Sequence, residues 1–118
     1  MLDTIREEKI SKEEVLSWKN NTTSHVLERI NRLSEIDFDR MQIEIAFMVD
    51  KGHKDGYEIH VITRRAEILI FNYNTHKMIT VLFARPKQIT RYRWKNPQMF
   101  NRILGVAIQN ERTGKNNI

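Results

Sequence analysis

Hydrophobic residues follow two different spacings along the chain, one before Gly52 and one after Gly56. In the first part they recur mostly every three or four residues, which is the period of an amphipathic helix, with a weak break near residues 36–37. These positions are Val26, Leu27, Ile30, Leu33, Phe38, Met41, Ile45 and Met48. Ser11 and Glu14 have the spacing of a capping box, which predicts a shorter helix over residues 12–19. The sequence therefore predicts helical structure over residues 11–51, with two helices or one kinked helix after residue 24.

After Gly56 the hydrophobic period falls to about two, and β-branched and aromatic residues become frequent. This pattern predicts four strands, over residues 57–63, 67–72, 77–84 and 88–94. Their short connections permit only antiparallel neighbours, so the sheet over residues 57–94 should be a meander. Asn96 and Pro97 favour the start of a C-terminal helix over residues 97–112. Residues 1–118 are thus predicted to form one α+β domain, with helices on one side of the sheet and the other side available for use.

The positive charge is concentrated in the middle of the chain. Residues 51–95 contain 10 Lys and Arg against 3 Asp and Glu, whereas residues 1–50 contain 7 against 11. A basic segment joined to an acidic one favours a polyanionic partner, and nucleic acid is the commonest polyanion in a cell. The alternative is a basic surface that serves solubility alone.

The start of the chain and its cysteine content indicate where the protein resides. Residues 1–14 lack the apolar stretch of a secretory signal, and no apolar run is long enough to span a bilayer. The absence of cysteine excludes disulfides and thiolate metal sites. These features predict a cytoplasmic protein without a membrane partner.

His60 is the first candidate for chemistry. Alternation places Glu58 and His60 on one face of the strand over residues 57–63, and it places Thr80 on the same face of the third strand. The two strands flank a third, so His60 and Thr80 should lie roughly 9–10 Å apart, and a substrate would have to link them. A histidine can exchange a proton with a ribose 2′-hydroxyl while arginines stabilise charge on the phosphoryl group. The alternative is a histidine with a structural role.

Residues 88–94 alternate arginines with hydroxyl and aromatic groups. Arg91 and Arg93 share one face and could grip phosphates, while Tyr92 and Trp94 could stack on bases. Further cations that could contact nucleic acid are Lys54, Arg64, Arg65 and Lys87. The alternative is an edge strand whose arginines discourage aggregation while Tyr92 and Trp94 cover the core.

The sequence shows no signature of a metal or cofactor site. His25, His53 and His76 lack the spacing of metal ligands. The chain also contains no Walker loop, no G-x-G-x-x-G and no G-x-S-x-G. We therefore expect no metal and no cofactor.

The order of predicted elements, with His60, Thr80, Arg85 and Arg91-Tyr92, resembles the barnase, EndoU, colicin and RelE-like superfamily of metal-independent ribonucleases over about residues 24–108. Many members are bacterial toxins or phage-encoded nucleases. The resemblance implies an RNA endonuclease with His60 as general acid or base, Thr80 as a phosphate-orienting hydroxyl and Arg85 and Arg91 as phosphate clamps. It also implies an antidote or regulatory protein as partner. The chain departs from the pattern at the catalytic glutamate, because neither Glu58 nor Glu67 has a position that requires it to reach His60.

Two alternatives belong to other functional classes. One is a noncatalytic regulator or inhibitor, encoded by a phage or mobile element, that uses the basic sheet to bind nucleic acid, RNA in particular. The other is an interaction module that forms a homodimer through Leu69, Phe71 and Leu82.

Overall fold

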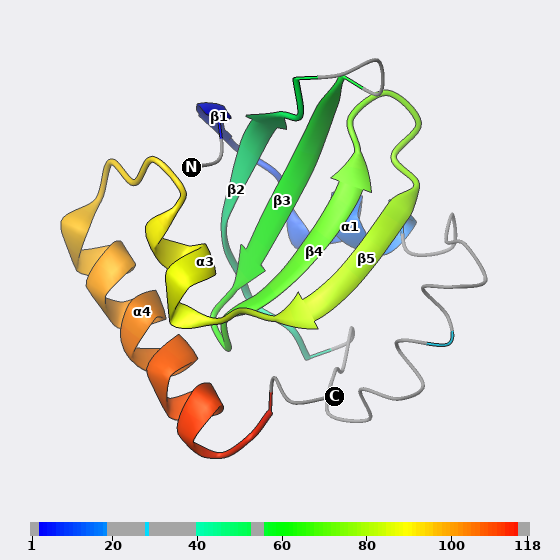
Figure 1. The fold of residues 1–118 in the computed structure, drawn as a ribbon. Helices are drawn as coiled ribbons and strands as arrows, with labels where there is room; N and C mark the ends of the chain where they lie inside the picture. Colours follow the sequence, from blue (N-terminus) through cyan, green and yellow to red (C-terminus); the bar gives the residue numbers. More distant parts are fainter. Residues whose placement is uncertain (1–2, 19–27, 29–39, 53–55, 116–118) are drawn as a thin grey trace.

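The computed structural model describes residues 3–18, 28, 40–52 and 56–115, and these residues form an α+β fold around one antiparallel sheet (Figure 1). The elements follow the order β1 (Asp3–Glu8), α1 (Lys12–Trp18), β2 (Ile43–Asp50), β3 (Tyr57–Thr63), β4 (Glu67–Asn72), β5 (Met78–Phe83), α3 (Pro86–Thr90) and α4 (Pro97–Arg112). The five strands lie side by side in chain order. The α+β class is therefore confirmed, with five strands instead of four.

Three predicted strands and both predicted terminal helices are confirmed. β3 and β4 have the predicted bounds, and β5 is one residue shorter at each end than predicted. The Ser11 hydroxyl accepts a hydrogen bond from the Glu14 amide at 3.1 Å, as a capping box requires. The Asn96 side chain caps α4 by accepting from the amides of Gln98 and Met99.

The end of the predicted helical region, which runs to residue 51, is wrong in the part that the structure describes, because Ile43–Asp50 is strand β2. β2 lies between β1 and β3, and its residues Ile45–Val49 are buried on both faces of the sheet. A strand buried on both faces reads as a continuous apolar run without alternation. Such a run mimics the spacing of a helix at Ile45 and Met48. The other predicted helical positions between residues 26 and 38 lie outside the described residues.

β1 is a strand that the sequence analysis did not predict. It pairs antiparallel with β2, from Asp3 opposite Asp50 to Glu8 opposite Ala46, with a register shift between Thr4 and Arg6. Its sequence, DTIREE, is rich in charge, as edge strands often are. The charged residues of β1 therefore hid the strand pattern, and the segment joins the sheet by pairing with the apolar strand β2.

The fourth predicted strand, residues 88–94, is also wrong. Pro86 begins the short helix α3, where a proline is tolerated because its missing N–H would be unsatisfied there anyway. The Gln88 side chain accepts a hydrogen bond from the Arg85 amide at 2.7 Å, and Ile89 is fully buried. The chain beyond Thr90 leaves the helix without forming a strand.

Both faces of the sheet carry a buried cluster, which corrects the expectation of one face left available. The first cluster, on the face that carries α1, contains Val15, Ile59, Val61, Leu69, Phe71 and Val81. The second, on the face that carries α3 and α4, contains Phe47, Ile62, Ile68, Ile89, Ile103 and Ala107. Figure 1 shows α1 behind the sheet and the two C-terminal helices on the opposite side. Leu69 and Phe71, proposed for a dimer surface, are fully buried within the chain.

Candidate nucleic-acid interface

The four predicted catalytic residues lie in β3, in β5 and on either side of α3. His60 is in β3 and Thr80 in β5, and the register of β3, β4 and β5 places them in one row across the sheet with Ile70 between them. His60 and Thr80 therefore share a face, the one that carries α3 and α4. Arg85 precedes α3 and Arg91 follows it, and both arginines are exposed.

His60 belongs to a buried hydrogen-bond network. The residue is 3% exposed, its Nδ1 lies 2.7 Å from the Tyr92 hydroxyl, and its Nε2 lies 2.9 Å from Glu58 Oε1. A carboxylate can only accept, so Nε2 donates to Glu58; Nδ1 of the neutral ring then accepts from the Tyr92 hydroxyl. Lys51 Nζ lies 3.7 Å from the same Glu58 oxygen. This assignment gives each ring nitrogen a partner.

The environment of Tyr92 favours its protonated form. Burial raises the pKa of the Tyr92 phenol well above its usual value of 10.0, the negative charge of Glu58 raises it further, and Arg91 lowers it. The ring stacks on Phe47 with their centroids 4.9 Å apart. Tyr92 is thus a buried hydrogen-bond donor at neutral pH, and its ring faces the core and not solvent.

Glu58 is the partner of His60 that the sequence analysis left unassigned. Residues two apart on a strand point to the same face, so Glu58 and His60 are side-chain neighbours within β3. The two-residue spacing was therefore the feature of the sequence that could have indicated the contact between Glu58 and His60. The contact with Tyr92 crosses 32 positions of sequence and depends on how α3 packs against the sheet, so local spacing could not reveal it.

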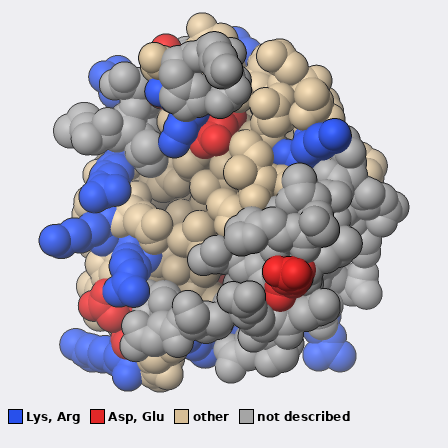
Figure 2. All heavy atoms as spheres, turned by 45° about the vertical axis from the view of Figure 1, so that its right-hand side comes forward, with Lys and Arg blue, Asp and Glu red and all other residues tan. Residues whose placement is uncertain are grey.

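Five of the candidate and neighbouring cations lie together in a run that we call the basic segment, residues 85–95. It contains Arg85, Lys87, Arg91, Arg93 and Lys95 and no acidic residue. All five side chains are exposed, and none forms an ion pair with another residue that the structure describes. Figure 2 shows Lys and Arg side chains along one side of a hollowed, uncharged surface.

The aromatic residues of the basic segment point inward. Tyr92 contacts His60, and the half-buried Trp94 donates from Nε1 to the Ile89 carbonyl at 2.7 Å. Trp94 also packs edge-on against Phe47 with centroids 5.1 Å apart. These side chains therefore cover the core, as in the alternative interpretation of residues 88–94, while the arginines between them point outward.

The other predicted phosphate-binding cations are engaged elsewhere or lie outside the described residues. Arg64 Nε lies 3.0 Å from Glu44 Oε1, and Arg102 lies 2.7 Å from the other oxygen of the same carboxylate. The Arg65 guanidinium lies 5.9 Å from the centre of the Phe83 ring. Lys54 lies outside the described residues.

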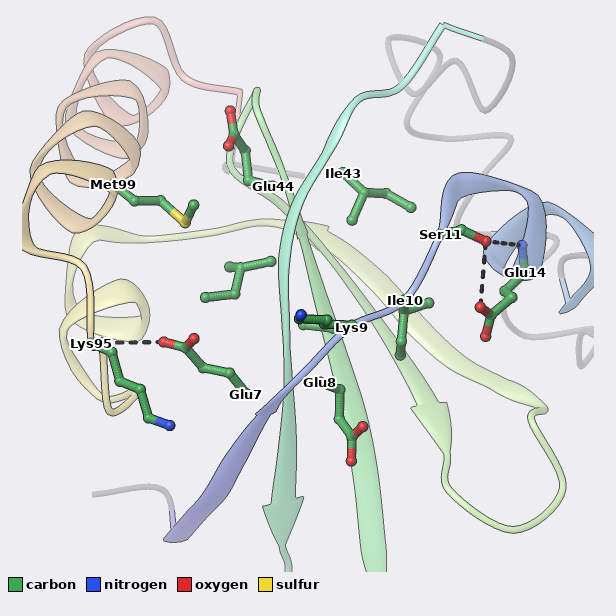
Figure 3. Close-up of a pocket in the computed structure, with 12 residues that line it drawn as sticks. Glu7, Glu8, Lys9, Ile10, Ser11, Glu14, Ile43, Glu44, Lys95 and Met99 are labelled. Carbon is green, nitrogen blue, oxygen red and sulfur yellow. Dashed lines mark hydrogen bonds between the residues drawn. The ribbon is translucent and has the colours of Figure 1, made fainter.

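A cavity of about 680 Å³ lies beside the end of the basic segment, where β1 leaves β2 (Figure 3). Met99 reaches toward it from α4 and Glu7 from β1, and the Glu7 carboxylate accepts a hydrogen bond from the Lys95 amide at 3.1 Å. Its lining combines glutamates with Lys9 and Lys95. Among the described residues, no group of three or more His, Asp or Glu side chains is arranged to hold a metal ion.

No helix in the described part of the chain is long and apolar enough to cross a membrane. Comparisons of the chain with protein-family models, with curated proteins and with solved structures found no match.

Proposed function

We propose that the protein binds nucleic acid without cleaving it and that the basic segment contacts the phosphates. The observation that carries this proposal is the set of five exposed cations within eleven residues, with no acidic residue among them and no ion-pair partner among the described residues. Lysines and arginines that neutralise phosphates release condensed counterions, which drives binding. RNA is the first polymer to test, since the resemblance to ribonucleases implies it.

The geometry around His60 favours binding over cleavage. A general acid or base must come within hydrogen-bond reach of the proton that it transfers. His60 is 3% exposed, and Glu58 and Tyr92 occupy both of its ring nitrogens. Ribonuclease activity of the kind implied by the resemblance would require His60 to exchange one of these partners for a ribose hydroxyl. The described arrangement supports a structural role for the imidazole.

The test is the affinity for a fluorescent RNA oligonucleotide measured by anisotropy over a range of salt concentrations. Arg91→Gln with Arg93→Gln should weaken binding about tenfold or more and reduce the slope of log K against log salt by about 1.4, for two lost phosphate contacts on a single strand. The matched control is Arg64→Gln with Arg102→Gln. It removes the same charge, but from arginines already paired with Glu44.

Two results would refute the proposal. Equal weakening by both double variants would show that net charge matters and the basic segment does not. Affinity that is the same at low and high salt would exclude phosphate contacts altogether. A gel that follows the RNA in the presence of EDTA separates binding from cleavage. If the unmodified chain cut the RNA reproducibly and His60→Ala abolished the cutting, the protein would be a metal-independent ribonuclease and the proposal of binding without cleavage would be wrong.

A further inference from the structure

The C-terminal helices cover only part of their face of the sheet. Two rows of side chains cross this face from β2 to β5. Along the first row, the exposed fractions are 9% for Ile45, 0% for Ile62 and 1% for Ile68, after which Leu82 is half-buried. Along the second, they are 0% for Phe47 and 3% for His60, after which Ile70 and Thr80 are half-buried. The cover of α3 and α4 therefore ends over β4.

The partly exposed end of this face is uncharged, and its two apolar side chains, Ile70 and Leu82, border the second cluster. We call Ile70, Thr80 and Leu82 the open patch. Two of these side chains are apolar, and the third is a hydroxyl that makes no hydrogen bond to another residue in the described part of the chain. Figure 2 shows that one face of the molecule has an uncharged surface with Lys and Arg along one side of it. An apolar floor with a hydroxyl matches the face and edge of a nucleobase, because the face is apolar and the edge carries donors and acceptors.

The open patch adjoins the basic segment along the chain. Leu82 is in β5, and Arg85, the first cation of the segment, follows three residues later. Three extended residues span at most about 11 Å, so a nucleotide whose phosphate meets the first cations of the segment can place its base over the end of β5. The open patch and the first cation of the basic segment are thus close along the chain.

We infer that the open patch receives the bases of a single-stranded nucleic acid whose phosphates lie on the basic segment. This inference rests on the proposed function and narrows its ligand to unpaired strands. A duplex stacks its bases on one another and presents only phosphates and groove edges, whereas a single strand can turn its bases onto a protein surface. The open patch can therefore add affinity for a single strand only.

The experiment compares three probes that carry the same number of phosphates: a single-stranded oligonucleotide, its abasic analogue and a duplex. We expect the single strand to bind about fivefold more tightly than the abasic analogue, which corresponds to burial of about 40 Å² of apolar surface. The duplex should bind like the abasic analogue after correction for its charge density. This comparison uses the unmodified chain and does not depend on the folding of any variant.

Variants then locate the site. Ile70→Ala should reduce single-strand affinity to about that of the abasic probe while the affinities for the abasic probe and the duplex stay unchanged. Ile108→Ala, an equal truncation of an isoleucine that is 38% exposed on α4, should change none of them. Thr80→Val keeps the side-chain shape and removes the hydroxyl, and it should weaken only the base-containing single strand.

The outcomes separate this inference from the proposed function. Equal affinity for the three probes, still dependent on salt and on Arg91 and Arg93, would overturn the open patch as a base site and leave the basic segment as a phosphate site. Salt-insensitive binding, or no binding of any probe, would overturn both. Preference for the single strand that is unchanged in Ile70→Ala and Thr80→Val would place the base site elsewhere and refute the inference.

Discussion

Tyr92→Phe isolates one hydrogen bond of the buried network. The substitution removes the hydroxyl that lies 2.7 Å from His60 Nδ1 and keeps the ring that stacks on Phe47. His60 is 3% exposed and Tyr92 is 5% exposed, so water has little access to the orphaned nitrogen. Leaving a buried acceptor without its donor costs about 1–3 kcal/mol, whereas the apolar surface buried by the ring is nearly unchanged. We therefore expect a loss of about that size in the free energy of unfolding.

The loss is large enough to measure by thermal and urea denaturation followed by circular dichroism. An unfolding entropy of about 2.1 cal/mol/K per residue gives about 0.25 kcal/mol/K for a chain of this length, so Tm should fall by about 4–12 °C. The matched control is Tyr57→Phe, because Tyr57 is 38% exposed and its hydroxyl has no hydrogen-bond partner among the described residues. It should change Tm by no more than about 2 °C. If the two variants were equally stable, the hydrogen bond to His60 would not stabilise the fold, and the reasoning would be refuted.

Three further predictions concern titration, capping and surface charge. Because the pKa of Tyr92 is raised in the folded chain, its stabilising effect is complete below about pH 10 and is lost as pH rises toward the folded pKa; alkaline urea titrations should show this decline in the unmodified chain and a smaller one in Tyr92→Phe. Asn96→Ala should cost about 1 kcal/mol in urea unfolding because it removes the α4 cap, whereas Asn101→Ala within the same helix should not destabilise. Glu44→Gln should cost less than about 1 kcal/mol, and less still at high salt, because the side chains of Arg64 and Arg102 are 60% and 51% exposed; a larger, salt-independent loss would contradict this assignment.

Local pattern was sufficient where turn residues bound a run of β-branched residues, although β3 and β4 are buried on both faces. The alternation in residues 57–63 and 67–72 and the Asn96-Pro97 signal predicted β3, β4 and α4 with their observed bounds. The pattern failed at β2, because residues 45–49 form an unbroken apolar run without the polar alternation that Glu58 and His60 give β3. It also failed at β1, whose pairing depends on β2 and not on its own apolar content.

The failure at residues 88–94 has a different physical cause. The alternation of Arg91, Tyr92, Arg93 and Trp94 correctly separates outward from inward side chains, since the arginines are exposed and the aromatic side chains pack inward. Alternation reports burial, however, and not backbone hydrogen bonding. Pro86 and the Gln88 cap favour helix α3 instead, and β5 is an edge strand of the described sheet. The alternation therefore identified the exposed cations correctly, although the predicted strand was wrong.

Residues 91–95 have no regular secondary structure, so side-chain anchors must fix the positions of the cations that they carry. Tyr92 bonds to His60, Trp94 bonds to the Ile89 carbonyl, and the Lys95 amide bonds to Glu7. An anchor and a phosphate contact act differently on binding. If the basic segment binds phosphates as proposed, loss of Arg91 removes one contact and reduces the salt slope. Loss of the Tyr92 hydroxyl instead keeps all five cations and increases the conformational entropy that binding must remove. Tyr92→Phe should therefore weaken nucleic-acid binding without changing the salt slope of binding. That result would show that the hydrogen bond between Tyr92 and His60 preorganises the basic segment.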